Sequence, residues 1–232
     1  MFTWGYNKCG VLGIDNQNIM LQIKPDSQAP IKFKDPSSHD KKINISDVAC
    51  GFNSMIAISD EQQIFVWGRR QGVYPQTELT LSAVEKSSQI FNCAEIHSYS
   101  PRLVKNNLIF HNIVKIFAGH SNHALLTDKG EILMQGMNDY NQLCLPKEIA
   151  EHLNFFPEFR KIDQLNEYKI QDIAIGSCGV HTICVHKSTG AKKLFGWGSN
   201  LFGQLGNSDT KFSLNEPIDM SSIVGDDCKD II

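Results

Sequence analysis

Short apolar runs, each about the length of one β-strand, recur along the chain with Gly or polar residues between them. One kind of run is mostly β-branched, alternates with period two and ends in Gly. It occurs at 45–51, 113–119 and 170–176. β-Branched residues with this alternation are typical of strand rather than helix. We therefore predict a first strand at each of these positions.

A second strand and a polar turn follow each of these runs. The second strands are predicted at 55–59, 123–127 and 181–185. The turns are predicted at 60–63, 128–131 and 187–190. The last two turns contain Gly, which adopts positive φ at little steric cost. The pattern therefore predicts a hairpin between the second strand and the next one.

A third, aromatic strand closes on a Trp-Gly pair or its counterpart. These pairs are Trp4-Gly5, Trp67-Gly68, Gln135-Gly136 and Trp197-Gly198. Their spacings are 67 − 4 = 63, 135 − 67 = 68 and 197 − 135 = 62 residues. A near-constant period of this size indicates repeated supersecondary units. A loop follows each pair and is clearest as Trp-Gly-Ser-Asn-Leu-Phe-Gly-Gln-Leu-Gly at 197–206.

A strand led by Pro is predicted after the loop, at 30–33, 101–104 and 217–220. A Pro at the start of a strand suits the outer edge of a sheet, where one N–H faces solvent. Each unit thus contains four short strands, so the pattern predicts an all-β fold.

These motifs, in this fixed order and over essentially the whole chain, resemble the repeat of the regulator of chromosome condensation (RCC1-like) family. The resemblance implies blades of four antiparallel strands, seven of which form a closed β-propeller. The chain holds about four units, roughly 1–51, 52–119, 120–176 and 177–232. We therefore expect part of a seven-bladed propeller, incomplete at the C-terminus. Because open sheet edges are a liability, closure is expected from further sequence or from another chain, unless a short natural form caps itself.

Composition limits the class of function. The 232 residues are 41% hydrophobic and carry a net charge of −3, as in ordinary globular proteins. Basic groups are short (Lys41-Lys42, Arg69-Arg70, Lys192-Lys193), so binding of nucleic acid or chromatin is not expected. No apolar run approaches the ~20 residues that span a bilayer. We expect no membrane contact and an intracellular location, cytoplasmic or nuclear.

The seven cysteines are odd in number and include no Cys-x-x-Cys. Several lie in apolar stretches, such as Cys50 and Cys184. We interpret them as small buried thiols in a reducing compartment rather than as a disulfide framework or a zinc site.

The repeat positions are interpreted as structural. Each Trp is expected to pack between blades, and its Gly to permit close backbone approach. His123 and His181 begin equivalent strands, and recurrence at one repeat position favours a structural hydrogen bond over a metal or a catalytic base. The predicted structural positions are Trp4, Gly5, Trp67, Gly68, His123, Gly136, His181, Trp197 and Gly198.

No residue is predicted to be catalytic, to bind a cofactor or to ligate a metal. The loop at 198–206 lacks the Gly-Lys-Ser/Thr ending of a nucleotide-binding loop. The chain contains no nucleophile elbow, no zinc-protease motif and no paired-carboxylate motif.

Two segments depart from the repeat and are candidates for a specific role. The first is a Ser-, Thr- and Glu-rich insert at 76–100, close to a pair of arginines. It is either a partner-binding loop on a rigid scaffold or a solvated excursion. The partner-binding candidates are Arg69, Arg70, Glu78, Leu81, Glu85, Ile90 and Phe91. The second segment is 148–160, where a short helix over 147–154 or packing on the blade edge is expected.

The leading hypothesis is a non-enzymatic module for protein–protein interaction, acting as a scaffold through its loops and faces. The resemblance to the founding member of the family implies an alternative, a guanine-nucleotide exchange factor for a Ran-like small GTPase. The catalytic residues of that member do not map onto this chain. A structural subunit of a large assembly is a further alternative.

Overall fold

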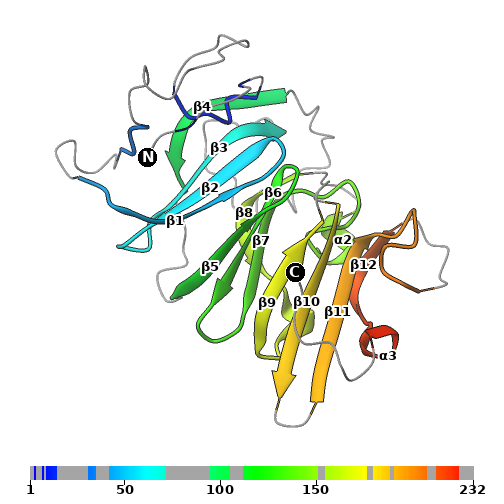
Figure 1. Ribbon diagram of the computed structural model, residues 1–232. Helices are drawn as coiled ribbons and strands as arrows, with labels where there is room; N and C mark the ends of the chain where they lie inside the picture. The colour runs from blue at the N-terminus through cyan, green and yellow to red at the C-terminus, as the bar shows by residue number, and fades with distance from the viewer. Residues whose placement is uncertain are drawn as a thin grey trace.

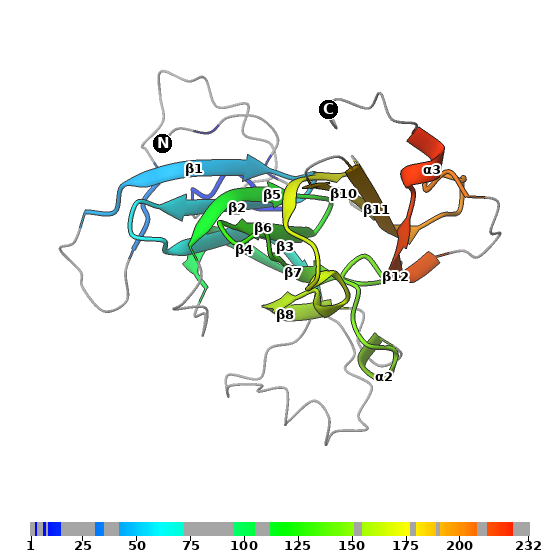
Figure 2. The same ribbon diagram turned by 90° about the horizontal axis from the view of Figure 1, so that it is seen from below.

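The computed structural model describes residues 3, 7, 9–14, 31–34, 42–71, 95–104, 112–150, 155–176, 180–188, 191–207 and 213–224. Within these residues, three four-stranded antiparallel sheets stand side by side in chain order (Figures 1 and 2). Each sheet runs through its strands in sequence order. This is the arrangement of successive propeller blades, so the all-β blade fold predicted from the repeat is confirmed.

We call the sheets blades I, II and III. Blade I contains β1 (Ile45–Cys50), β2 (Ser54–Ser59), β3 (Ile64–Gln71) and β4 (Glu95–Leu103). Blade II contains β5 (Ile113–Ala118), β6 (Asn122–Thr127), β7 (Ile132–Met137) and β8 (Phe155–Lys161). Blade III contains β9 (Ile170–Ile175), β10 (His181–Ser188), β11 (Ala191–Ser199) and β12 (Ser213–Asp219). The first, second and third strands predicted for these three blades are thus confirmed, and the strand predicted before Trp4-Gly5 lies, apart from Thr3, outside the described residues.

The fourth strand was predicted less well. β4 and β12 begin before Pro101 and Pro217, so neither Pro leads its strand. Each Pro instead lies in a register irregularity on an edge strand, for example between the pairs Val66↔Arg102 and Gly68↔Ser98. A residue without an N–H is tolerated there because the ladder is already interrupted. Residues 31–33, the described part of the earliest predicted Pro-led strand, are not in a strand.

Blade II also has a fourth strand that the Pro pattern missed. Residues 155–161 form β8, with Pro157 in the same irregularity between Met134↔Arg160 and Gly136↔Phe156. Phe156 and Phe159 of this strand are buried. The later part of the 148–160 segment is therefore a regular blade strand on the sheet edge. The predicted helix begins as expected in α2 (Lys147–Ala150), and 151–154 lie outside the described residues.

Two of the three turns predicted after the second strands are present. These are the turns at 60–63 and 128–131, with positive φ at Gln62 and Gly130. Of the turn predicted at 187–190, residues 187 and 188 instead belong to β10, which continues to Ser188, and 189–190 lie outside the described residues.

The two largest hydrophobic clusters among the described residues lie between blades. Leu126 and Met134 of blade II share a buried cluster with Cys184 and Trp197 of blade III. A second cluster contains residues of blades I and II, among them Ile56, Val66, Leu125 and Leu133. A single β-sheet has two faces and no interior of its own. It therefore buries its apolar side chains by packing against a neighbouring sheet.

The loop after the third strand has the same internal structure in three copies. An Asn side-chain oxygen accepts a hydrogen bond of 3.0 Å from the backbone N–H of a Leu five residues later. The pairs are Asn7 with Leu12, Asn138 with Leu143, and Asn200 with Leu205. All six residues are buried. The Asn of the repeat is therefore the residue that holds the loop together.

Asn200→Ala is expected to lower the free energy of unfolding by about 1–3 kcal/mol, because it leaves the buried Leu205 N–H without its acceptor. Denaturant unfolding measures the effect. Asn200 Nδ2 also donates to Asn207 Oδ1 at 2.7 Å, and Asn207→Ala removes only that bond. Equal losses in the two variants would show that the bond to Leu205 contributes little.

Candidate protein-binding surface

Two of the tryptophans join neighbouring repeat units. Trp67 Nε1 donates to the carbonyl oxygen of Val11 at 2.8 Å, and Trp197 Nε1 donates to that of Gln142 at 2.9 Å. Both side chains are fully buried, at 1% and 0% exposure. Val11 and Gln142 occupy the same place in the loops that precede them in the chain. Each Trp thus bonds the loop of the preceding unit, and Trp4 lies outside the described residues.

The Gly after each Trp position permits a close backbone contact. Gly68, Gly136 and Gly198 have φ of 100°, 112° and 94°. A Cβ at Gly198 would lie 2.5 Å from the carbonyl oxygen of Val180, and the other two positions are equally crowded. Gly5 lies outside the described residues.

The contact between blades I and II is built differently, because Gln135 stands where the other blades have Trp. Gln135 Nε2 lies 3.4 Å from His123 Nδ1. A small cavity of about 20 Å³ remains there, lined in part by Trp67, Gln135 and Phe155. A space of this size holds about one water molecule. The loop that a Trp would bond has also changed, since the segment after Gly68 lacks the repeat motif.

Turn residues replace the missing Trp contact. The backbone N–H groups of Phe52 and Asn53 donate to the carbonyl oxygens of Gly119 and His120, at 3.2 and 3.0 Å. Asn53 Nδ2 lies 3.2 Å from His120 Nε2. The ring of Phe52 stacks on that of His120, with centroids 5.1 Å apart and planes at 17°. The turns at 51–53 and 119–121 are thereby fixed against each other.

The two histidines of the sequence analysis do not occupy one repeat position. His181 pairs with Gly198, as Asn122 pairs with Gly136. His123 pairs instead with Gln135. The predicted equivalence of His123 and His181 is therefore wrong, because blade III has two more residues between the Gly that ends its first strand and the start of its second strand. Burial lowers the pKa of His181, whose ring packs over Gly176.

Blade I replaces the repeat loop with an extension of its outer strands. Arg69, Arg70 and Gln71 continue β3 and pair with residues 97, 96 and 95 of β4. The connection at 72–94 lies outside the described residues, as do the candidates Glu78, Leu81, Glu85, Ile90 and Phe91. Arg69 and Arg70 are placed by the strand register alone. The two-stranded extension shows from which end of the blade the insert leaves.

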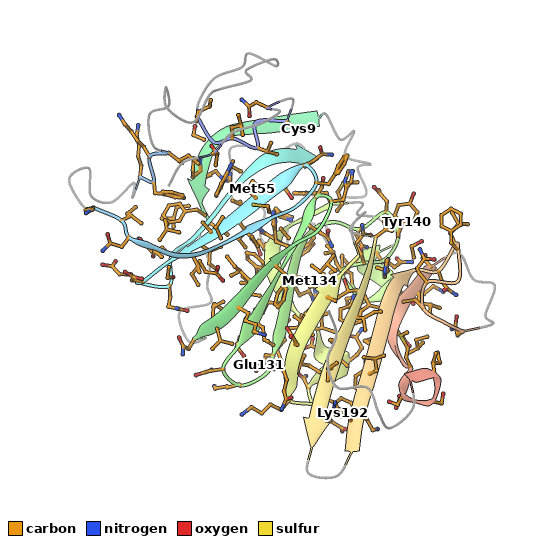
Figure 3. All side chains as sticks on the ribbon, viewed as in Figure 1. Cys9, Met55, Glu131, Met134, Tyr140 and Lys192 are labelled. Carbon is orange, nitrogen blue, oxygen red and sulfur yellow. The ribbon has the colours of Figure 1, made fainter. Side chains whose placement is uncertain are left out.

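The Trp–loop hydrogen bonds and the contacts between the turns at 51–53 and 119–121 lie at the same end of the blades as this insert. We call it the loop end. It comprises the turns between first and second strands and the loops after third strands. Figure 3 shows Cys9 and Tyr140 toward this end, with Glu131 and Lys192 at the opposite end. Phe52 is 71% exposed and Phe202 is 87% exposed. The N–H of Phe202 donates to Gln204 Oε1 at 2.8 Å, so the backbone that presents the ring is fixed.

Neither Phe52 nor Phe202 was predicted to be a binding residue from the sequence. A signal was present, because an apolar residue in a Gly-bounded turn cannot be part of a strand core. Phe52 directly follows Gly51, and Phe202 precedes Gly203.

The described residues contain no group of three or more His, Cys, Asp and Glu side chains that could hold a metal ion. Cys9, Cys144 and Cys184 are buried, but Cys50 is exposed, which corrects the expectation of a buried thiol there. Its strand, β1, has most of its residues open to solvent. Within the same part of the chain, no helix is long and apolar enough to cross a membrane.

Known proteins share both the repeat and the fold. No family model matches the chain. It is 28% identical over 174 residues to the probable E3 ubiquitin-protein ligase HERC4 of Rattus norvegicus, covering 75% of this chain and 14% of the ligase. It is 29% identical over 170 residues to an RCC1 repeat-containing protein of Dictyostelium discoideum, covering 69% of this chain and 30% of that protein.

Two solved structures resemble the chain in fold. Human WBSCR16 matches with a TM-score of 0.62 and 22% identity, over 93% of this chain and 47% of that one. Prp20p of Saccharomyces cerevisiae, whose binding to Gsp1p and histones is described with its structure, matches with a TM-score of 0.63 and 17% identity. That match covers 94% of this chain and 45% of Prp20p. The chain therefore spans less than half the length of each of these proteins.

Proposed function

Because the chain carries RCC1-like repeats folded as four-stranded propeller blades, we propose that it is a non-enzymatic module that binds other proteins through its loop end. The observation that carries this proposal is the exposure of Phe52 and Phe202 on a fixed backbone. Large exposed aromatic side chains are typical of the centres of protein interfaces.

The loop end is suited to binding because it is rigid. Phe52 is held by its own backbone bond to Gly119 and by stacking on His120. Phe202 lies in a loop that Asn200 and Gln204 hold through hydrogen bonds to the backbone. A side chain presented in this way loses little conformational freedom on binding, which favours affinity.

The insert of blade I also supports the loop end as the binding surface. It takes the place of a conventional repeat loop and leaves from the paired extension at Arg69–Gln71. Loops that project from a rigid scaffold are common binding elements. The five candidates within the insert and the two arginines remain part of the proposed interface.

The double variant Phe52→Ser with Phe202→Ser is expected to reduce the recovery of bound partners from native lysate about tenfold or more, because the interface loses two exposed aromatic side chains that a partner would cover. The matched control is Val48→Ser with Val114→Ser, which removes apolar side chains that are 40% and 50% exposed on first strands. Quantitative mass spectrometry measures the recovery.

Equal recovery in the double variant and in the control would remove the loop end from the proposal. A separate assay tests the exchange-factor alternative. Faster nucleotide release from a Ran-like GTPase in the presence of the wild-type protein would favour that alternative. We expect no acceleration of nucleotide release.

A further inference from the structure

Each blade directs one face of its second and third strands toward the blade that follows it in the chain. In blades I and II, the residues on this face are at most 5% exposed: Ile56, Ile58, Ile64, Val66, Ala124, Leu126, Ile132 and Met134. Those of blade I belong to the cluster shared with blade II, and those of blade II belong to the cluster shared with blade III. These residues are therefore buried because a further blade packs on them.

Blade III has the same apolar face. Its ladder register places Ile183, Val185, Leu194 and Gly196 at the equivalent positions. The three aliphatic side chains are only partly buried. Figures 1 and 2 show blade III at the end of the row of three sheets. We call Ile183, Val185 and Leu194 the outer face of blade III. Among the described residues, no further sheet packs on it.

The loop of blade III lies against this face and carries a backbone acceptor. A Cβ at Gly196 would lie 3.1 Å from the side chain of Leu205. Gln204 directly precedes Leu205, as Val11 and Gln142 directly precede the equivalent Leu residues of the other two loops. The carbonyl oxygens of Val11 and Gln142 each accept a hydrogen bond from the Trp of the following blade. Within the described part of the chain, no backbone N–H donates to the carbonyl oxygen of Gln204, and neither Trp donor of the described blades reaches it.

The following blade contributes the same kinds of residue to both described contacts. Its first strand supplies two Ile residues, which are Ile113 and Ile116 in blade II and Ile170 and Ile173 in blade III. In blade III, its third strand also supplies Trp197. The chemistry of an occupant of the outer face is thus specified: an Ile-x-x-Ile first strand and a third strand that ends in Trp-Gly.

We propose that the outer face of blade III binds an RCC1-like blade of a partner chain, and that a Trp of this blade donates to the carbonyl oxygen of Gln204. Trp67 and Trp197 are already bonded inside their own chain. The described blades of a second copy therefore offer no such donor. A partner of another kind would cover the aliphatic side chains but would bring no indole N–H to Gln204.

Site-specific photo-crosslinking of the whole chain in cells tests the proposal. Leu194 is replaced by photoreactive benzoylphenylalanine, and the same replacement at Val114, which is 50% exposed, is the control. We expect position 194 to give an adduct whose crosslinked peptide contains an Ile-x-x-Ile or Trp-Gly strand of another RCC1-like protein. Leu194 lies five residues before the end of β11, which is roughly 16 Å along an extended strand. The adduct therefore reports on the blade face and is distinguishable from docking at Phe202.

A pair of matched substitutions separates binding from folding. Val185→Ser is expected to reduce the adduct from position 194 about tenfold, because it puts a hydroxyl into the proposed contact, and to change the thermal midpoint little. Leu126→Ser alters the equivalent residue of blade II, which is 2% exposed. It is expected to lower the thermal midpoint clearly, because that face is already packed against blade III.

Replacing the Trp of the captured blade by Phe tests the hydrogen bond to Gln204. We expect binding of the purified chains to weaken about tenfold, since the carbonyl loses its donor. The proposal is overturned if position 194 gives no more adduct than position 114, or if the adduct lies in a second copy of this chain or in a protein without the repeat. Unchanged binding after the Trp→Phe replacement would also overturn it.

Discussion

Trp197→Ala is expected to lower the free energy of unfolding by about 3–5 kcal/mol, the usual cost of truncating a buried Trp. The side chain is fully buried between blades II and III, in a cluster with Leu126, Met134 and Cys184. Its N–H also donates to the carbonyl oxygen of Gln142, which joins the two units. Urea denaturation followed by circular dichroism measures the loss.

Trp197→Phe is the matched control, because it keeps an aromatic ring in the cluster and removes the N–H. It is expected to cost about 1–3 kcal/mol, since the carbonyl of Gln142 loses its donor and some ring volume is lost. If Trp197→Ala cost no more than Trp197→Phe, packing between the blades would not be the source of stability.

Gly198→Ala is expected to be nearly as damaging, with a loss of about 3 kcal/mol from backbone strain and a forced shift of neighbouring atoms. The residue has a φ of 94°, and an added Cβ would lie 2.5 Å from the carbonyl oxygen of Val180. A backbone carbonyl within a strand connection cannot move aside as a flexible side chain can. Denaturant unfolding again measures the change.

Gly203→Ala separates the two contributions. Gly203 also has a positive φ, of 72°, but nothing lies within 4 Å of the position of its missing Cβ. Its replacement should cost about 1 kcal/mol, the penalty for positive φ alone. Equal losses at Gly198 and Gly203 would show that the close contact with Val180 does not matter.

The strand order of each blade was predictable because it depends on local patterns. A β-branched run that ends in Gly, a second apolar run and an aromatic strand ending in Trp-Gly are visible without tertiary information. Pro157 shows the limit of that approach. Its strand, β8, follows a helix rather than the usual variable segment, and its Pro lies inside the strand, so the pattern "Pro leads a strand" did not find it.

The histidines show a second limit. His123 and His181 begin similar apolar runs, and the sequence does not reveal the two additional residues before His181. Only the ladder register, in which His181 pairs with Gly198 and His123 with Gln135, separates the positions. A register depends on hydrogen bonds between strands, which a single run of residues does not specify.

The candidate surface was only partly predictable. The sequence showed where the repeat is broken, at Arg69-Arg70 and in the insert that follows. It did not show that Gln135 lines a small cavity with Trp67 of blade I, or that Phe52 and His120 join blades I and II. These contacts link residues far apart in the chain, so they follow from the packing of blades rather than from any motif.

Site-specific photo-crosslinking tests the central claim, docking through the loop end, most directly. Phe202 is replaced by photoreactive benzoylphenylalanine, and the same group is placed at Val114 on β5 as the control, since that side chain is also exposed, at 50%. After irradiation in cells, mass spectrometry identifies and quantifies the adducts. The account predicts a defined protein adduct from position 202 and much less of it from position 114. Equal adducts from both positions, or adducts from position 114 alone, would contradict it.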